Sequence, residues 1–220
     1  LPYKIISAIN EVKATKNPDE EMKKVEKLNL KIITINDSNY PPALAEITDR
    51  PAMLYVKGEL SELDEVAISV VGSRKYTPYG ERVTEELVYA LASEGVTIIS
   101  GLALGIDAIA HKAALEPKNG RTIGVLGCGL DQIYPASNRY LADRIVKEKR
   151  GALISEFPLG APAMKHHFPF RNRIIAGLSM GTIIIEGALK SGSLITARCA
   201  IDYNREVFAV PGSIFNEKSE

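Results

Sequence analysis

The sequence predicts an α/β protein built on a doubly wound, mostly parallel Rossmann-like sheet with an N-terminal strand extension. After residue 66, six short apolar runs rich in β-branched residues recur about every 25–30 residues, a spacing that suits strand–helix–strand crossovers. Amphipathic stretches separate these runs, and strands this uniformly apolar are usually buried on both faces of a parallel sheet. The 220 residues, with 45% hydrophobic and 25% charged side chains, suit one folded domain with a small appendage.

The first 65 residues differ from the rest. Asn17-Pro18-Asp19 predicts the start of a charged helix, because proline fits the first helical turn. Short strands are expected at 31–35 and 52–57, and 58–65 is interpreted as a linker. We therefore expect a helical segment at 1–30, a strand extension with its linker at 31–65, and a Rossmann-like domain at 66–220.

The regular part of the chain supplies the expected sheet and its crossover helices. Strands are predicted at 66–71, 97–100, 122–126, 152–155, 182–186 and 207–210, and helices at 79–94, 105–115, 138–147, 170–178 and 193–201.

Composition excludes several classes of protein. No apolar run approaches the ~20 residues of a membrane helix, and no signal-peptide pattern is present. The two cysteines, Cys128 and Cys199, are too few for a disulfide framework and favour a reducing compartment. With 27 basic and 27 acidic residues the net charge is zero, so any nucleic-acid site must be a local feature.

Small residues cluster where the predicted strands end, which is where ligands bind in such sheets. Backbone N–H groups at the helix starts that follow would suit phosphate oxygens, so an anion-binding rim is expected. The alternative is that these glycines serve tight turns and close packing. A third glycine of a dinucleotide fingerprint would fall at Gln132, and no Walker pattern occurs, so neither NAD nor another cofactor is expected. The candidate positions are Gly72, Ser73, Arg74, Gly101, Gly105, Ser191, Gly192 and Ser193.

The stretch from 165 to 173 has five potentially cationic side chains, two phenylalanines and no acid. Cations that track phosphates beside an aromatic stacking face are typical of single-strand sites. The alternative is a solvated basic loop with phenylalanines in the core. We expect one phenylalanine to stack on a base and the other to lie in the core; Phe168 is the candidate for stacking, and which of the two stacks stays open. Lys165, Arg171 and Arg173 are the candidate phosphate ligands, although helical spacing allows one arginine to pair internally, with Glu186 as a candidate partner.

Catalytic and metal-ligating patterns are weak. His111 lies one helical turn from Asp107 and is interpreted as a structural histidine. Cys128, between two glycines, is interpreted as a small residue in a tight turn rather than a nucleophile. The pair His166-His167 has no nearby Cys or carboxylate to complete a metal site. No catalytic residue and no metal are expected.

Seven ordered motifs together resemble the DNA-processing protein A family (DprA, also called Smf), and the resemblance extends from about residue 30 to the C-terminus. They are Gly72-Ser73-Arg74, Ser100-Gly101 with Gly105-Ile106-Asp107, Gly127-Cys128-Gly129 with Tyr134-Pro135, Ser155-Glu156-Phe157-Pro158, Phe168-Pro169 with Arg171-Asn172-Arg173, Ser191-Gly192-Ser193, and Pro211-Gly212.

The resemblance implies a cytoplasmic bacterial homodimer without catalytic activity. Such a protein binds and protects single-stranded DNA during natural transformation (competence) and helps load the RecA recombinase for DNA recombination. By motif, Arg74 would bind phosphate, while Lys165 and Phe168 would lie in a loop that contacts backbone and base. It also implies that 1–30 is the remnant of an N-terminal helical domain, and that the chain is a truncated part of a longer protein lacking a C-terminal winged-helix-like domain.

One rival comes from a different class of function. Nucleotide-processing phosphoribohydrolases have a related architecture, with a Pro-Gly-Gly-x-Gly-Thr loop beside a catalytic Glu. That loop is absent here, and Glu186 before Gly187 is only a faint counterpart.

Overall fold

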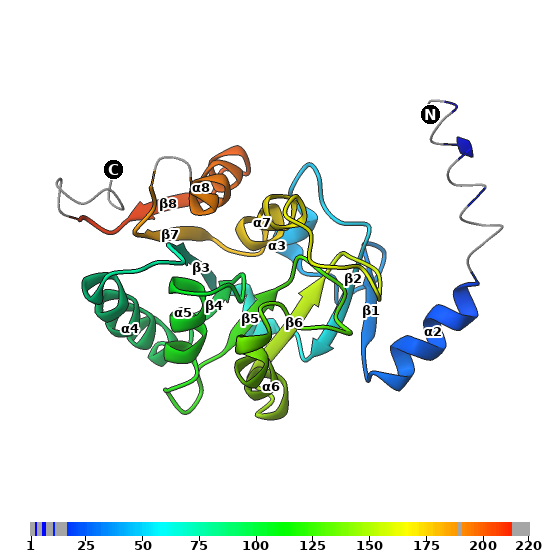
Figure 1. Cartoon of the computed structure of the whole chain (residues 1–220), viewed down its shortest axis with the longest axis horizontal. Helices are drawn as coiled ribbons and strands as arrows, with labels where there is room; N and C mark the ends of the chain where they lie inside the picture. The colour runs from blue at the N-terminus through cyan, green and yellow to red at the C-terminus, as the bar shows by residue number, and fades with distance from the viewer. Residues whose placement is uncertain (1–2, 4–5, 8–10, 12–16, 189–190, 213–220) are drawn as a thin grey trace.

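Eight strands form one mixed sheet in the part of the chain that the structure describes, in the order β1-β2-β6-β5-β4-β3-β7-β8 (Figure 1). The structure is a computed structural model that describes residues 3, 6–7, 11, 17–188 and 191–212. The expected doubly wound, mostly parallel sheet with an N-terminal strand extension is therefore confirmed. The strands are β1 (Lys31–Thr34), β2 (Met53–Gly58), β3 (Ala67–Gly72), β4 (Thr97–Ser100), β5 (Thr122–Val125), β6 (Gly151–Ser155), β7 (Gly181–Ile185) and β8 (Glu206–Ala209).

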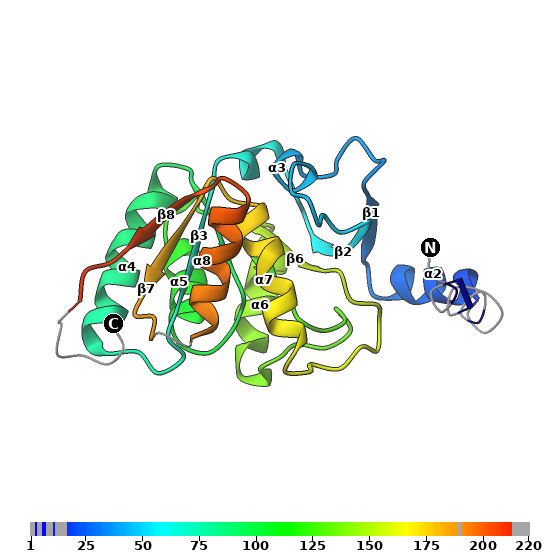
Figure 2. The same ribbon diagram turned by 90° about the horizontal axis from the view of Figure 1, so that it is seen from above.

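The helices cover both faces of the sheet. In Figures 1 and 2, α4, α5 and α6 lie on one face, and α3, α7 and α8 lie on the other. The helices are α2 (Pro18–Lys27), α3 (Pro42–Ala45), α4 (Pro78–Ser93), α5 (Ile106–Ala114), α6 (Arg139–Lys147), α7 (His167–Gly177) and α8 (Gly192–Asp202), with short 3₁₀ turns η1 (Glu62–Glu65) and η2 (Ala136–Asn138).

The strands are apolar on both faces because both faces are covered. Every residue of β4 and β5 is buried. Ile99 and Ile123 pack with Ile174 of α7 on one side of the sheet, while Ile98 packs with Ile106 of α5 on the other. This two-sided burial is what produces continuous β-branched runs in a parallel sheet.

The strand order reverses between β3 and β7. The chain proceeds from β3 through β4 and β5 to β6, then crosses back by way of α7 to pair β7 with β3 in parallel. Ligands in open α/β sheets bind beyond the carboxyl ends of the strands at such a switch point. The fold therefore places a crevice where β3 and β7 end and α7 begins.

The N-terminal extension continues the same sheet. Strand β2 pairs antiparallel with β6, and β1 pairs antiparallel with β2. Helix α2 packs against this extension through the buried Val25, and the Tyr55 hydroxyl donates a hydrogen bond to Glu21 at 3.1 Å. The expected helical segment at 1–30 lies partly outside the described residues.

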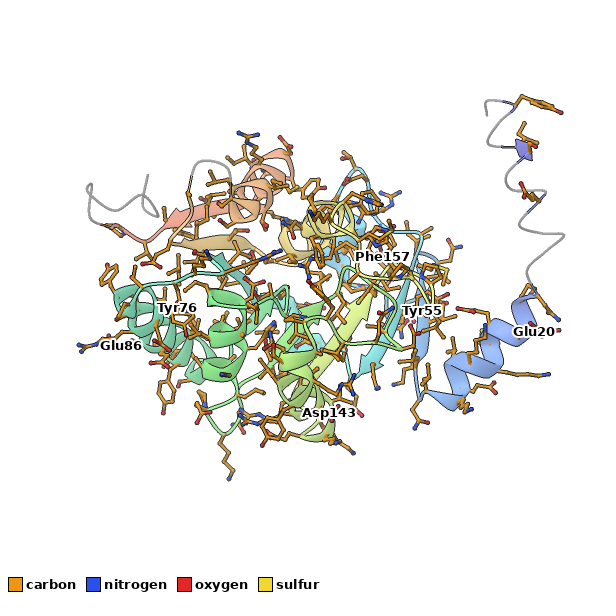
Figure 3. All side chains as sticks on the ribbon, viewed as in Figure 1. Glu20, Tyr55, Tyr76, Glu86, Asp143 and Phe157 are labelled. Carbon is orange, nitrogen blue, oxygen red and sulfur yellow. The ribbon has the colours of Figure 1, made fainter. Side chains whose placement is uncertain are left out.

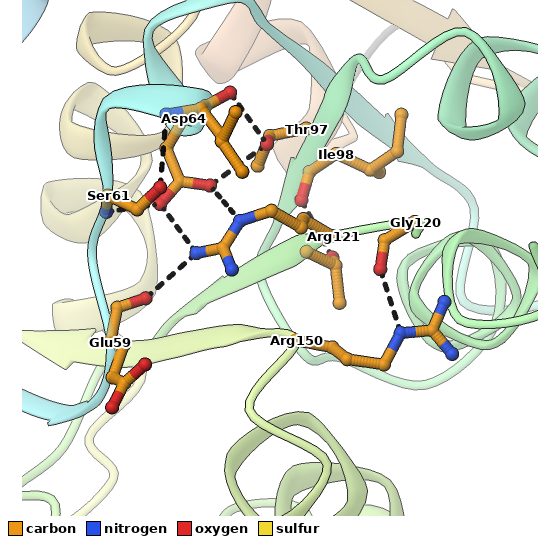
Figure 4. A network of polar contacts seen from close by, with 10 residues as sticks. Glu59, Ser61, Asp64, Thr97, Ile98, Gly120, Arg121 and Arg150 are labelled. Atoms are coloured by element: carbon orange, nitrogen blue, oxygen red, sulfur yellow. Dashed lines mark hydrogen bonds and ion pairs between the residues drawn. The ribbon is translucent and has the colours of Figure 1, made fainter. Parts of the chain in front are cut away.

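The segment at 58–65 is more ordered than a linker. Ser61 and Asp64 form a capping box around η1. The Asp64 carboxylate accepts hydrogen bonds from Arg121 Nε at 2.8 Å and from Thr97 Oγ1 at 2.9 Å, and Figure 4 shows this network. These contacts fix η1 to the starts of β4 and β5.

Two differences from the predicted elements have simple causes. Helix α7 begins at His167, three residues before the expected start, because Pro169 fits a first helical turn. The short elements α3, η1 and η2 were not expected, because three or four residues carry no measurable periodicity. Among the described residues, no helix combines the length and apolarity needed to cross a bilayer.

Candidate nucleic-acid interface

A pocket of about 750 Å³ lies at the switch point. Nine of the twelve candidate binding residues line it; Gly101, Gly105 and Arg173 do not. The nine are Gly72, Ser73, Arg74, Lys165, Phe168, Arg171, Ser191, Gly192 and Ser193.

The turn after β3 presents Arg74 to the pocket. A side chain at Gly72 would collide with the Ile185 carbonyl and approach Ile106 to 2.8 Å, so only glycine lets β3, β7 and α5 meet here. The Ser73 hydroxyl accepts a hydrogen bond from the backbone N–H of Lys75 at 3.1 Å and donates to the Lys75 carbonyl at 2.8 Å. This compact turn leaves the Arg74 side chain exposed.

Phe168 forms the aromatic wall of the pocket. Its ring packs against Gly127, where an added Cβ would lie 3.0 Å away, and the Tyr134 ring lies 5.5 Å from it. The guanidinium carbons of Arg74 and Arg171 lie 5.7 and 6.0 Å from the ring centroid. An aromatic face flanked by cations suits a nucleotide, which has a flat base and an anionic phosphate.

Arg171 is a buried charge at the floor of the pocket. It is 4% exposed and donates hydrogen bonds to the carbonyls of Gly101, at 2.8 Å, and Val125. Burial lowers its pKa to about 10, so it stays protonated at neutral pH. Asp107 beneath it accepts a hydrogen bond from the Gly101 N–H at 3.1 Å, and its pKa is raised by burial. Arg171 thus ties α7 to the ends of β4 and β5 and contributes positive potential from below.

The N-terminus of α8 closes another side of the pocket. Ser191, the N-cap residue, makes no side-chain capping hydrogen bond; its hydroxyl instead lies 2.6 Å from that of Ser193. Asn172 donates to the Gly192 carbonyl at 3.0 Å, which ties this turn to α7. The partial positive charge at the start of an 11-residue helix favours an anion in the pocket.

Two expectations about the 165–173 stretch are wrong. Neither phenylalanine lies in the core, because Phe168 is half-buried at the pocket and Phe170 is 51% exposed. Arg173 is the internally paired arginine, but its partners are Glu156, at 2.7 and 2.8 Å, and Asp49, at 3.5 Å, instead of Glu186. It is 6% exposed and lies outside the pocket, because helical spacing turns it away from Arg171.

Glu186 has a different role from the one considered. Its carboxylate accepts hydrogen bonds from the backbone N–H of Thr77 at 2.8 Å and from the Thr77 hydroxyl. It packs against Gly80, where a Cβ would meet its carboxyl carbon at 2.5 Å. These contacts brace the start of α4, and Glu186 is not among the residues that line the pocket.

Gly101 and Gly105 serve close packing, as the alternative interpretation held. A Cβ on Gly101 would lie 2.6 Å from both Arg171 and Asp107. Gly105 has a φ of +81°, and a Cβ there would lie 2.7 Å from the Arg74 Cα. Both glycines therefore support the pocket from behind.

The structural interpretation of His111 and Cys128 is supported by their surroundings. His111 is buried and hydrogen-bonded to Thr122 at 2.7 Å, and burial lowers its pKa to about 3. The Cys128 thiol is buried, and burial raises its pKa to about 11, which disfavours the thiolate that a nucleophile needs. Within the described ranges, no group of three or more His, Cys, Asp or Glu side chains could hold a metal ion.

Several pocket residues were not singled out from the sequence as binding residues. Tyr134 was noted only as part of a Tyr-Pro motif and Asn172 only as the residue between two arginines, whereas both line the pocket. Lys75 follows the glycine–serine–arginine turn and adds an exposed cation. The sequence signal that could have identified them is their position next to the strand ends that were already expected to bind a ligand.

Comparison with known proteins supports this architecture. A family model described as DNA recombination-mediator protein A matches residues 31–220. Protein Smf of Escherichia coli is 51% identical over 196 residues, which are 89% of this chain and 52% of that protein. DNA processing protein DprA of Streptococcus pneumoniae is 45% identical over 187 residues, 85% of this chain and 65% of that protein. The chain thus spans about half to two thirds of the length of these relatives.

Solved structures agree with these sequence matches. The crystal structure of DprA from S. pneumoniae superposes with a TM-score of 0.87 at 40% identity, covering 97% of this chain and 74% of that one. DprA from Helicobacter pylori, whose structure was determined to describe its single-stranded DNA binding mode, superposes with a TM-score of 0.76 at 34% identity, covering 85% and 83%. With its fold, its strand-exit pocket and the family model over residues 31–220 in agreement, this chain belongs to the DNA-processing protein A (DprA/Smf) family of DNA recombination mediators.

Proposed function

We propose that this chain is the single-stranded DNA-binding part of a recombination mediator of natural transformation. The observation that carries the proposal is the pocket that joins Arg74, Lys165 and Phe168 with the N-terminus of α8. Cations and a helix N-terminus bind phosphate, and an aromatic ring stacks on a base of any sequence. The H. pylori relative, whose structure describes single-stranded DNA binding, supports the same ligand.

The zero net charge is compatible with this function because the cations are gathered at one site. Arg74, Lys75 and Lys165 are exposed and line the pocket, and the buried Arg171 adds a fourth positive charge beneath it. Three exposed phosphate contacts on a single strand correspond to a slope of log affinity against log salt of about −2.

The finer parts of the proposal concern the cell and the partners. We place the protein in the cytoplasm, where it protects incoming strands and helps load the RecA recombinase onto them. The family description as a recombination mediator supports this role. We assign it no catalytic activity. We also retain the division into 1–30, 31–65 and 66–220 as a proposal, with the last region carrying the DNA site.

A homodimer is part of the proposal, formed through the surface at 189–210. Leu189 and Lys190 lie outside the described residues, but the rest of this surface includes β8, the edge strand of the sheet. Phe208 on β8 is 50% exposed and Ile201 of α8 is 64% exposed. Apolar side chains beside an open strand edge favour pairing with a second copy.

The test of the function is a titration of a fluorescent oligothymidylate across salt concentrations, with Arg74→Ala compared with Arg82→Ala. Arg82 is an exposed arginine on α4 outside the pocket, paired with Glu86. Arg74→Ala should weaken binding and reduce the salt slope by about 0.7, whereas Arg82→Ala should change neither. Arg74→Lys should restore only part of the affinity, because a point charge cannot replace the guanidinium fork. An unchanged slope for Arg74→Ala would remove Arg74 from the phosphate path.

The enzymatic alternative is checked in the same preparation. A phosphoribohydrolase would release free base from a ribonucleoside monophosphate, so incubation with AMP should show no turnover above the buffer blank. If the parent protein shows turnover and Glu186→Gln abolishes it, the enzymatic function would be favoured over the DNA-binding function.

A further inference from the structure

An exposed phenylalanine lies beside the pocket without lining it. Phe170 follows Phe168 by two residues in the first turns of α7, and residues two apart in a helix point to different sides. Phe168 lines the pocket, whereas Phe170 is 51% exposed and outside it. A phenyl ring has no polar atom, so covering this exposed ring with a ligand would be favourable through the hydrophobic effect. We propose that Phe170 is a second stacking platform, which holds the base next to the one in the pocket.

The Phe170 ring is held in place from beneath. The Arg173 guanidinium lies 4.3 Å from its centroid and is itself fixed by Glu156 and Asp49. Among the described residues, Nε and Nη1 of Arg173 find no hydrogen-bond acceptor, although Nε lies 3.5 Å from an Asp49 carboxylate oxygen. Burying an incompletely satisfied guanidinium costs stability. Because Arg173 packs on the Phe170 ring and is itself held by two carboxylates, the ring keeps one orientation. Stacking a base on it would therefore lose little side-chain entropy.

Other rings connect this platform to the pocket. Phe157, labelled in Figure 3 in the segment between β6 and α7, meets Phe170 edge-on at 6.2 Å and stacks on His167 at 4.1 Å. His167 Nδ1 lies 3.2 Å from the carbonyl oxygen of Gly127, the residue against which Phe168 packs. Phe157 and His167 therefore bridge Phe170 to Gly127, the residue that packs against Phe168 in the pocket wall.

The charges around this path suit a nucleic-acid backbone. Lys165 and His166 are exposed just before α7 and can approach a phosphate between the two bases. The nearby carboxylates of Asp49 and Glu156 are engaged by Arg173, and the Tyr203 hydroxyl also donates to Asp49. The continuity of rings and cations with the pocket identifies the occupant as the same DNA strand rather than an apolar partner protein.

The inference rests on the proposed function, so its test uses two ligands. Thymidine monophosphate fills the pocket alone, whereas an oligothymidylate of roughly 12 nucleotides can also reach Phe170. Phe170→Ala should weaken oligothymidylate binding about fivefold or more and leave dTMP binding unchanged. Phe168→Ala should weaken both. Tyr140→Ala removes a 77% exposed ring from α6 and should change neither.

Conservative variants separate stacking from a general loss of apolar surface or of fold. Phe170→Tyr should restore oligothymidylate affinity, because it keeps the flat ring, whereas Phe170→Leu should not. All three Phe170 variants should unfold at nearly the same temperature as the parent, because the side chain is half exposed.

Photo-crosslinking locates the bases directly. Trypsin cleaves after Lys165 and Arg171 and so releases both phenylalanines in one short peptide, residues 166–171. Fragment spectra of that peptide, linked to a 5-iodouracil-substituted strand, should show adducts at both Phe168 and Phe170.

The titrations separate failure of this inference from failure of the function. If Phe168→Ala lowers the affinity for oligothymidylate and Phe170→Ala does not, the second stacking platform is overturned and the proposed function stands. A parent protein that binds no single strand would overturn the function itself.

Discussion

His111 shows how one buried side chain can make stability depend on pH. The Thr122 hydroxyl donates to the Ile98 carbonyl at 2.7 Å, so it accepts the hydrogen bond from His111 Nδ1. The other ring nitrogen, Nε2, then accepts from the backbone N–H of Leu102 at 3.3 Å. A second proton on the ring would remove this acceptor and place a charge in the core, which agrees with the pKa of about 3.

The free energy of unfolding should therefore fall as the pH falls from about 6.5 towards 3. In this range the unfolded chain protonates its histidine and the folded chain does not, so stability is fully present above pH 6.5 and decreases by about 1.4 kcal/mol per pH unit below it. Urea denaturation of the parent and of His111→Gln at several pH values measures the effect. The variant should lose stability less steeply with falling pH, and parallel profiles would contradict the assignment.

At the scale of elements, the turn after β3 and the start of α5 are packed together through Gly105. The Ser73 carbonyl accepts from the Ile106 N–H at 3.2 Å, and Gly105 faces the Arg74 backbone. The turn proposed to bind phosphate thus takes its position from a helix more than thirty residues later in the chain. Gly95, after α4, has nearly the same φ (+82°) but nothing within 4 Å of an added Cβ, so it is a matched control.

Gly105→Ala should destabilise the fold and displace the Arg74 turn, whereas Gly95→Ala should only add backbone strain. We expect Gly95→Ala to cost about 1 kcal/mol. Gly105→Ala should cost about 2 kcal/mol more, because Gly105, with φ +81° and ψ −132°, lies outside the left-handed helical region and the added Cβ collides with the Arg74 turn. Chemical denaturation and oligothymidylate titration measure the two consequences. If the two variants lost equal stability and Gly105→Ala bound DNA as the parent does, the turn after β3 and the start of α5 would not be coupled.

At the scale of the whole molecule, the sheet ends in two different ways. At one edge, β1 contacts α2, while the other edge, β8, carries the exposed Phe208. An open edge with apolar side chains is a template for pairing with a second copy. Strand β8 lies two strands away from β3, at whose end the proposed DNA pocket begins, so pairing at β8 would not cover β3 itself.

Phe208→Glu should convert the proposed dimer into a monomer at micromolar concentration, because a charge would be buried against its symmetry mate. Light scattering gives the mass, and Tyr140→Glu on α6 is the control for adding a charge at an exposed aromatic position. A monomeric parent protein would contradict the dimer for this length of chain, and a dimeric Phe208→Glu would move its interface elsewhere.

The sequence by itself determined the elements and the edge of the sheet that carries the site. Runs such as 97–100 and 122–126 are apolar because both faces are buried, and this burial is visible in the local pattern. Glycine, serine and arginine after β3 indicated the pocket, because strand ends of a parallel sheet meet at one edge.

Only the tertiary structure decided which neighbouring side chains face the ligand and which are buried. Arg173 is paired with Glu156 and Asp49, which come from the end of β6 and from the N-terminal extension. Such partners meet only when segments distant in the sequence fold together, so helical spacing alone could separate the two arginines but could not identify the partner. The same packing holds the Phe170 ring at the surface over Arg173, whereas the sequence left open which of Phe168 and Phe170 lies in the core.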